Sequence, residues 1–392
     1  EKLLAEGLDD FPEQVPLDRN FYIASRKGKM GLLDQEGNVL LPFEYDNIHS
    51  GSDGYRTPHF SLIKDVNRGY YNSATGHLFP ANYPEFEILD SLGFVKAFNS
   101  AGKYALFAPD GKQLTGFELN YVYRFGKQLF IADKAGKKGI LDNAGKTVIP
   151  FELTDIRNNE EYNSDISGFA ILTKDNRHGL MLDDGTLLLP IEYYYIEAAG
   201  NFAFKVRMAD FQELLIDRKG RIIAGPAKFH INMVTDSCFH LDDAETEALI
   251  GLDGRFILPF AERGISCNSA LCIVKEPGRW SLIRPDGTVV LSPEYELIAF
   301  NIDQSEGPFL IGKNGKYGYV NRQGRQLTLL EYDYADAFAY DRAAVRKNGK
   351  WSFVDTTGRL IAPLKFRYAE NFQFEKNEKV VLGEKGNLLI DR

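Results

Sequence analysis

The sequence is poor in sulfur-containing residues and in tryptophan. Its 392 residues include only three cysteines, four methionines and two tryptophans. Because three is an odd number, the cysteines predict no disulfide framework, and we interpret each as a small buried hydrophobic residue. They leave the cellular compartment open. The three are Cys238, Cys267 and Cys272.

The chain also lacks a net positive charge and long apolar runs. The net charge of −9 is the opposite of the basic surface that nucleic-acid binding requires, so we expect no nucleic-acid partner. No apolar run approaches the roughly 18 residues of a membrane-spanning helix, so we expect no membrane span. The chain begins at Glu1 rather than Met, which leaves open whether a signal peptide or an upstream domain precedes it.

Motifs for catalysis are also missing. The sequence contains no nucleophile motif, phosphate-binding glycine loop or HExxH zinc motif. The stretch Asp183-Asp184-Gly185 resembles part of a calcium loop, but the ligand series and the closing glutamate of an EF-hand are absent. A hairpin turn explains it better. We therefore expect a protein that is not an enzyme and that holds no cofactor or metal.

One cluster of soft ligands qualifies that expectation. His230, Cys238 and His240 are close in sequence, and Cys267 and Cys272 follow in the next repeat. Thiolate and imidazole ligands suit zinc or copper. The spacing matches no known site, so we favour packing, and the sequence leaves open whether His230, Cys238 and His240 do more.

What the sequence has in place of motifs is self-similarity, which decides the architecture. Residues 28–48 read GKMGLLDQEGNVLLPFEYDNI, and near copies begin at residues 102, 137, 177, 279, 316 and 350. Each copy is centred on a turn glycine, and successive turn glycines lie 33 to 40 residues apart. We count ten turns and an eleventh repeat cut off at GNLLIDR. The turn glycines are Gly37, Gly76, Gly111, Gly145, Gly185, Gly220, Gly254, Gly287, Gly324 and Gly358.

Each repeat is predicted to be a β-hairpin followed by a third strand. Most turns begin with aspartate, as at Asp34, whose side chain can bond the turn backbone, and the glycine accepts the left-handed conformation. A proline such as Pro42 follows most turn glycines. Because proline is excluded from the centre of a sheet, it predicts the place where the second strand ends or bulges.

These repeats predict an all-β fold, a β-solenoid or superhelix of about ten hairpin-plus-strand units of ~35 residues. The alternative is a closed β-propeller, which fits less well because blades need four strands and about 40 residues, and rings hold about four to eight blades. Residues 1–24 fit the repeat poorly and are interpreted as an irregular N-terminal cap or linker. Residues 25–392 are interpreted as a single repeat array whose last unit is truncated.

A short signature recurs before each turn. In chain order it is a base, then an aromatic or bulky residue such as Met30 or Trp280, then a small residue such as Gly31. The small residue lies six positions before the turn glycine. With D-x-x-G and P-x-x-Y-D, this resembles the bacterial WG-repeat (KWG-type) family. The pattern is broken at Leu214 and Leu330. The resemblance implies a β-rich repeat array with an interaction role, and it carries over no catalytic residue.

Two rows of charge run through the repeats. A base lies eight positions before most turn glycines and a glutamate seven positions after many of them. We predict an ion pair across the open end of each hairpin; the alternative is a basic stripe that grips an anionic polymer. Where one partner is lost the other is usually lost too, which favours pairing. The predicted pairs are Lys29–Glu44, Lys103–Glu118, Lys137–Glu152, Arg177–Glu192, Arg279–Glu294 and Lys316–Glu331.

Function is predicted only as a class. Longer insertions at residues 49–67, 157–175 and 301–314 are polar and carry candidate binding residues for a partner. Residues 211–265 depart furthest from the repeat, through decay or through adaptation to a partner. The candidates are Tyr55, Phe60, Tyr162 and Phe309.

We expect a non-enzymatic binding scaffold that presents an extended surface to a protein partner. One alternative is a cell-envelope module that binds glycan or peptidoglycan, which predicts a row of exposed aromatic residues in a groove. Another is a toxin-neutralising or secretion-associated protein. The resemblance implies a bacterial protein, and a periplasmic or cell-envelope location is slightly favoured over the cytoplasm.

Overall fold

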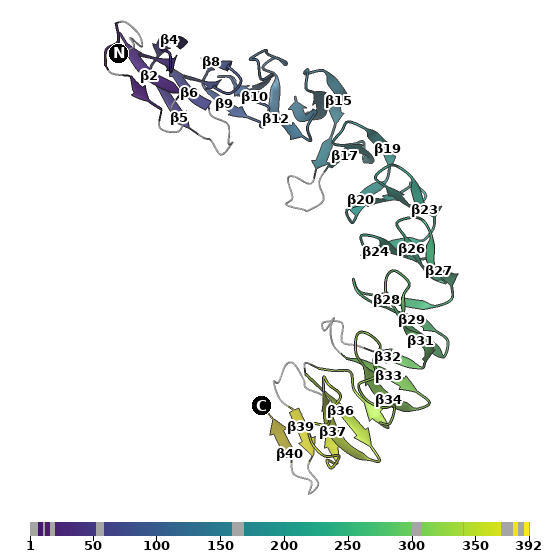
Figure 1. Cartoon of the computed structure of the whole chain (residues 1–392). Coiled ribbons are helices and arrows are strands. Elements are labelled where there is room, and N and C mark those ends of the chain that lie inside the picture. The colour runs from purple at the N-terminus through teal and green to yellow at the C-terminus, as the bar shows by residue number, and fades with distance from the viewer. Residues whose placement is uncertain are drawn as a thin grey trace. The chain divides into compact units, whose positions relative to one another are not determined.

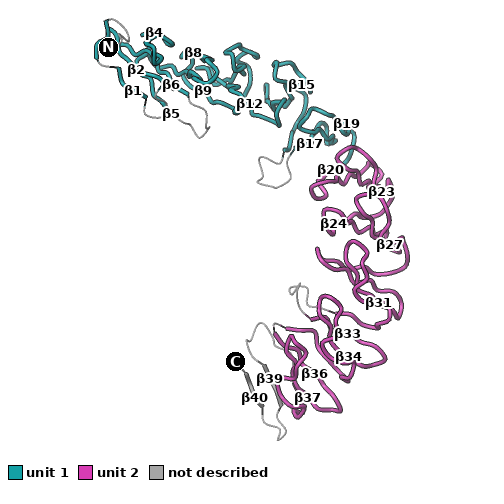
Figure 2. The backbone as a smooth tube through the Cα atoms, in the orientation of Figure 1, with its two compact units in different colours: residues 1–194 teal, residues 195–392 magenta. Residues whose placement is uncertain are grey.

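The computed structural model describes residues 7–10, 12–15, 20–51, 59–158, 168–299, 308–339, 341–369, 379–382 and 388–391. These residues form strands, turns and loops and contain no helix, so none of them belongs to a helix that could cross a membrane. The chain divides into two compact units, Glu1–Tyr194 and Tyr195–Arg392, coloured separately in Figure 2. Each compact unit is a succession of small antiparallel sheets (Figure 1).

The first compact unit contains four sheets, and within each sheet neighbouring strands are consecutive in the chain. They are sheet β1–β4 (Glu13–Gln14, Phe21–Arg26, Lys29–Asp34, Val39–Tyr45), sheet β5–β8 (Asn47–Gly51, His59–Lys64, Asn67–Asn72, His77–Tyr83), sheet β9–β15 (Glu85–Ile88, Val95–Phe98, Tyr104–Phe107, Leu119–Phe125, Leu129–Lys134, Lys137–Asp142, Thr147–Leu153) and sheet β16–β19 (Asp155–Asn158, Phe169–Lys174, Arg177–Leu182, Leu187–Tyr193).

The second compact unit contains six sheets of three or four strands. They are sheet β20–β23 (Tyr195–Ala199, Ala203–Arg207, Glu213–Asp217, Ile222–Ala227), sheet β24–β27 (His230–Thr235, Cys238–Asp242, Glu247–Gly251, Phe256–Ala261), sheet β28–β31 (Gly264–Cys267, Cys272–Glu276, Arg279–Ile283, Val289–Tyr295), sheet β32–β34 (Leu297–Ala299, Phe309–Lys313, Lys316–Val320), sheet β35–β37 (Tyr334–Ala335, Arg342–Lys347, Lys350–Asp355) and sheet β38–β40 (Tyr368–Ala369, Lys379–Leu382, Leu388–Asp391).

The usual sheet has four strands, one more than the repeat predicted. The predicted hairpin is the third and fourth strands, such as β7 and β8, and the predicted extra strand is the second, such as β6. The strand that the sequence did not reveal is the first. In β5 it is short and polar, and among its described side chains only Ile48 is a buried hydrophobic residue, so it gives no apolar pattern.

The turn glycines lie at equivalent corners, as predicted. All ten have positive φ, between 72° and 94°, and join the third strand to the segment that follows it. In the first turn, a carboxylate oxygen of Asp34 accepts hydrogen bonds from the backbone N–H groups of Glu36 and Asn38, at 2.9 and 2.8 Å. The aspartate and the glycine therefore define the turn together.

The small residue of the signature is required by a bulge in the opposite strand. Met30 pairs with Tyr45 but Leu32 pairs with Leu41, so β4 bulges over Gly31. A Cβ atom at Gly31 would lie 2.9 Å from the carbonyl oxygen of Leu41. Pro42 lies in this bulge on the edge strand, where its missing N–H removes no ladder bond. The predicted role of the proline is confirmed.

Three repeats replace the fourth strand with a loop. There the segment after the turn forms only isolated bridges, Phe107 with Gln113, Val320 with Gln326 and Val354 with Leu360. In two of them a threonine hydroxyl oxygen accepts the hydrogen bond that a strand carbonyl would otherwise accept. Thr115 accepts from the N–H of Leu106, and Thr328 accepts from the N–H of Tyr319, both at 2.9 Å.

The core lies between successive sheets. One cluster joins Leu32 and Leu41 of the first sheet to Phe60 and Leu62 of the next. The turn glycines set how closely the sheets stack. A Cβ atom at Gly324, in the turn after β34, would collide with the carbonyl oxygen of Val290 in β31 of the preceding sheet. The same glycine therefore permits both the left-handed turn and the close approach.

Candidate functional site

Two of the four candidate recognition residues belong to the core, which corrects the sequence-based prediction. Phe60 in β6 and Phe309 in β33 are 2% and 1% exposed. Phe60 contacts Phe21, with 5.5 Å between ring centroids. Both residues lie in second strands that face a neighbouring sheet, so their apolar side chains serve packing. Tyr55 and Tyr162 lie outside the described residues.

The predicted ion-pair partners are also wrong, although both charge rows do form ion pairs. None of the six predicted pairs, all within the described residues, lies within ion-pair distance. Lys29 pairs instead with Asp46, at 2.5 Å, and Lys316 with Asp333, also at 2.5 Å. Each glutamate pairs with a lysine at the end of the second strand of the next repeat. These pairs are Glu44–Lys64, Glu118–Lys134, Glu152–Lys174, Glu294–Lys313 and Glu331–Lys347.

The acid nine positions after the turn glycine also accepts a hydrogen bond from a backbone N–H of the next sheet. A carboxylate oxygen of Asp333 accepts a hydrogen bond from the N–H of Asn348, at 2.6 Å, and Glu296 accepts one from Asn314, at 3.2 Å. The hydrogen bond from Lys316 and then that from Asn348 hold the pKa of Asp333 below its usual value. These contacts recur as one set, which we call the interlock. It consists of the acids seven and nine positions after a turn glycine, together with the lysine and the turn N–H of the next repeat that they contact.

Two sheets of the degenerate region use a different connection. Glu213 and Glu247 occupy the position where the signature has its aromatic residue. Glu213 is buried, pairs with Arg207 at 2.6 Å and accepts the N–H of Ile231 from the next sheet at 2.9 Å. Each glutamate therefore links its sheet to the next one.

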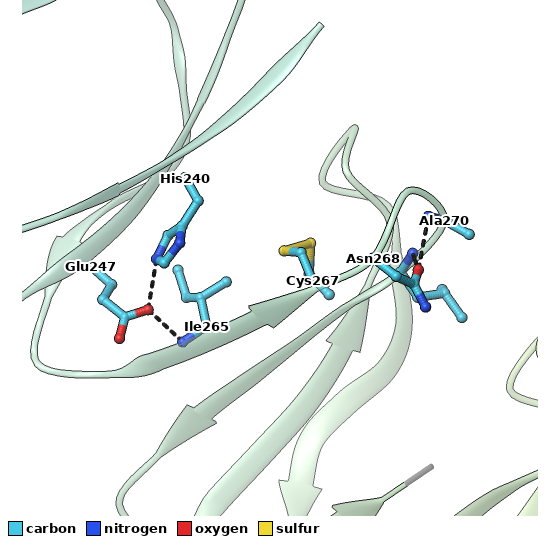
Figure 3. The surroundings of a disulfide bond; sticks show 8 residues. His240, Glu247, Ile265, Cys267, Asn268 and Ala270 are labelled. Atoms are coloured by element: carbon cyan, nitrogen blue, oxygen red, sulfur yellow. Dashed lines mark hydrogen bonds and ion pairs between the residues drawn. A yellow bond between two sulfur atoms is a disulfide. The ribbon is translucent and has the colours of Figure 1, made fainter. Parts of the chain in front are cut away.

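Glu247 repeats this arrangement one sheet later. One of its carboxylate oxygens lies 2.7 Å from Nε2 of His240 and accepts the N–H of Ile265 at 2.6 Å (Figure 3). His240, proposed as a metal-ligand candidate, is thus engaged by a carboxylate on the adjacent strand.

The soft-ligand cluster is not assembled as a metal site. No three histidine, cysteine or acidic residues gather in a metal-binding group within the described ranges. Cys238 is 1% exposed, as predicted for a small buried residue, and burial raises the pKa of its thiol to about 11. His230 is exposed on β24.

Cys267 and Cys272 form a disulfide, which corrects their assignment as free cysteines. They lie directly opposite each other on β28 and β29, with 4.1 Å between their Cα atoms. The turn between them is held by Asn268, whose side-chain oxygen accepts the N–H of Ala270 at 2.9 Å (Figure 3). Two cysteines on either side of a short turn could have predicted this disulfide, but the odd number of cysteines argued against any pairing.

The junction of sheet β24–β27 with sheet β28–β31 lacks the interlock. The two acid positions hold Ala261 and Arg263, the lysine position holds Glu276, and the turn N–H is lost at Pro277. A cavity of about 570 Å³ opens there. It is lined by the β25–β26 turn, the link between β27 and β28 and the β29–β30 hairpin.

Charges of both signs line this cavity. The acids are Glu245, Glu247, Glu262 and Glu276, and the bases are Arg263 and Lys275. The Nη1 atom of Arg263 lies 3.8 Å from Glu276, too far for a hydrogen bond. Lys275 lies over the ring of Trp280, with 5.0 Å between Nζ and the ring centroid. We take this cavity as the candidate small-ligand site.

A second surface feature follows the segments that come directly after the turn glycines. The residue two positions after the turn glycine is apolar in seven repeats and is 37 to 61% exposed in each. In the first compact unit these residues are Val39, Leu78 and Leu187. In the second they are Ile222, Phe256, Val289 and Leu360. We call these seven side chains the apolar edge row.

The comparisons with known proteins agree with the signature. The family described as "WG containing repeat" matches residues 30–55, 280–317, 317–351 and 351–377. No curated protein matches the chain.

Solved structures show only a shallow likeness. A eukaryotic initiation factor is 12% identical over 87% of this chain and 94% of its own, with a TM-score of 0.29. PorZ, a surface component of the type-IX secretion system of Porphyromonas gingivalis, is 11% identical over 84% of this chain and 54% of its own, with a TM-score of 0.22. Hsv2p of Kluyveromyces lactis is 10% identical over 62% and 92%, with a TM-score of 0.24. With TM-scores this low, none of them supports an inference about this chain.

Proposed function

Because this chain is a member of the WG-repeat family, we propose that it is a non-enzymatic scaffold that binds a protein partner. The observation that carries the proposal is the apolar edge row. Single exposed apolar residues are ordinary on a protein surface, but a contiguous apolar patch is typical of an interaction site.

In the second compact unit the row continues over three successive sheets. Ile222 begins β23, Phe256 begins β27 and Val289 begins β31, and these strands follow one another along one side in Figure 1. Neighbouring strands and turns touch. A Cβ atom at Gly254 would lie 3.6 Å from the carbonyl oxygen of Ile223, and one at Gly287 would lie 3.0 Å from Ile257. The strands and turns that carry the row therefore lie against one another on these sheets.

Aromatic residues widen the row at its centre. The ring of Phe256 lies 5.9 Å from that of Phe260, which is itself exposed, and Phe260 lies 6.1 Å from Phe229. Aromatic side chains are enriched in the central residues of protein interfaces. A partner that covers these rings removes apolar area from water, the main favourable term in protein association.

Affinity capture from the source organism tests the proposal. Three baits are compared: the wild type, a triple variant and a control variant. The triple variant carries Ile222→Ser, Phe256→Ser and Val289→Ser. The control carries Val66→Ser and Leu329→Ser, which remove exposed apolar residues away from the row. We expect a protein that is captured by the wild type and the control and lost with the triple variant. Equal capture by all three, or no reproducible capture by the wild type, would contradict the proposal.

We further propose that the sheets continue as a solenoid rather than closing into a ring, since the same turn-to-strand contact recurs between successive sheets within each compact unit. A bacterial cell-envelope or periplasmic location is also proposed. The Cys267–Cys272 disulfide supports it, because disulfides persist in oxidising compartments. Fractionation of the source cells followed by detection of the chain tests the location.

A further inference from the structure

The cavity between sheets β24–β27 and β28–β31 lies where all four positions of the interlock are changed. At five other junctions a glutamate of one repeat pairs with a lysine of the next, as in Glu44–Lys64. Here Arg263, at the second acid position, faces Glu276, at the lysine position, so the base follows the first sheet and the acid lies on the next. Ala261 removes the first acid, which would face the lysine position, and Pro277 removes the backbone N–H that the second acid would accept. The changes keep opposite charges across the junction and leave a space between them.

Arg263 is the residue that most needs a ligand. Its side chain is only 10% exposed, it lines the cavity, and it forms no hydrogen bond with any residue that the structure describes. The Nε atom of Arg263 is buried and has no hydrogen-bond partner within the described part of the chain, and burying a charged donor without an acceptor is costly. Acceptors that enter the cavity from outside would remove this cost.

The charge balance restricts what those acceptors belong to. An anion entering the cavity would approach four carboxylates, those of Glu245, Glu247, Glu262 and Glu276. A cation could pair with these carboxylates, but it would offer Arg263 no acceptor and would be repelled by Arg263 and Lys275. A neutral molecule with many hydroxyl groups avoids both repulsions, because each hydroxyl can accept from a base and donate to a carboxylate.

Trp280 supplies the apolar part of the site. It lines the cavity and is half-buried, so part of its ring is available for contact. Ligand sites of this kind combine an aromatic surface with a few convergent polar groups and enclose about 300 to 1,000 Å³. The cavity of about 570 Å³ falls within that range, but it is open to solvent and its lining is mostly polar, with Trp280 as its aromatic residue.

We propose that this cavity binds a neutral saccharide. Its hydroxyl groups would accept hydrogen bonds from Arg263 and donate to Glu245 and Glu262 at the cavity mouth, and its apolar face would lie against Trp280. The site is separate from the apolar edge row, so the scaffold would hold a small ligand and a protein partner on different surfaces.

Isothermal titration of the full chain with neutral trisaccharides of glucose, mannose, galactose and N-acetylglucosamine tests the proposal. Inorganic phosphate and tri-lysine serve as the anionic and cationic probes. We expect at least one trisaccharide to bind saturably, Arg263→Met to weaken it about tenfold or more because a charge-assisted hydrogen bond is lost, and Arg255→Met to leave it unchanged. Arg255 is the matched control because its side chain is 90% exposed and does not line the cavity.

Three results would overturn the proposal: no trisaccharide binds, the affinity is the same in Arg263→Met, or only phosphate or tri-lysine binds. If Arg263→Met fails to fold, as judged by circular dichroism, the double variant Glu245→Gln and Glu262→Gln replaces it. Both glutamates are exposed at the mouth, so this variant is expected to fold. It should weaken trisaccharide binding severalfold, and unchanged affinity in a folded double variant would equally overturn the proposal.

Discussion

Two glycines of one repeat allow the cost of a left-handed backbone to be measured apart from the cost of a collision between repeats. Gly349 and Gly358 are both left-handed, with φ of 71° and 84°. A Cβ atom at Gly349 would meet nothing within 4 Å, whereas one at Gly358 would collide with the backbone of Leu327 in the preceding repeat. Gly349→Ala and Gly358→Ala therefore share the backbone strain, and only the second adds the collision.

The expected costs follow from these two contributions. A left-handed conformation costs an alanine about 1 to 2 kcal/mol, so Gly349→Ala should lower the free energy of unfolding by that amount. Because the obstacle at Gly358 is a backbone carbonyl and not a movable side chain, Gly358→Ala should lose about 1 to 3 kcal/mol more.

Urea unfolding of the full chain measures the difference, with native-state hydrogen exchange to locate it. In Gly358→Ala the additional exchange should appear in both sheets that meet at the collision, β32–β34 and β35–β37, because neighbouring repeats stabilise each other. In Gly349→Ala it should remain within β35–β37. Equal losses of stability in the two variants would refute the claim that the turn glycine is needed for stacking.

Three further predictions concern side chains. Because the pKa of Asp333 is lowered in the fold, first by the Lys316 hydrogen bond, its contribution is present above the unfolded pKa and is lost as pH falls through the folded value. Asp333→Asn should thus destabilise the chain at pH 7 and weaken the dependence of urea unfolding on pH below about 4; an unaltered profile would contradict this. Cys238, with its pKa near 11, should not react with iodoacetamide at pH 8 unless the chain is unfolded, and labelling of the native chain by mass spectrometry would show otherwise. Cys267→Ser, which opens a disulfide between residues 5 apart, should lower unfolding stability by about 2 kcal/mol; no loss would mean that the hairpin is held without the bond.

The features predicted correctly from the sequence are those set by local geometry. A left-handed glycine after an aspartate, and a proline opposite a small residue, each depend on a few neighbouring residues. The turn at Asp34 to Gly37 and the irregularity at Pro42 were therefore readable from one repeat, and ten repeats in phase made the all-β assignment firm. That the bulge lies over Gly31 required the structure.

The features that the sequence did not predict depend on contacts between sheets. The base and acid rows were visible, but Glu44 and Lys64 belong to different sheets, so pairing within one repeat selected the wrong partners. Phe60 lies next to a polar insertion and was assigned to it, although the adjacent sheet buries its ring. The cavity lies at a junction where four interlock positions are changed, and these changes can be recognised only once the residues of the interlock are known.

Restoring the interlock where it is missing tests most directly whether it holds successive sheets together. The variant carries Ala261→Glu, Arg263→Asp, Glu276→Lys and Pro277→Asn, which place the usual acids, lysine and turn N–H at the junction of β24–β27 with β28–β31. We expect its free energy of unfolding in urea to rise by about 1 kcal/mol, since ion pairs and hydrogen bonds of this kind each contribute a fraction of that to about that much. A folded variant whose unfolding free energy is unchanged or lower would contradict the interlock.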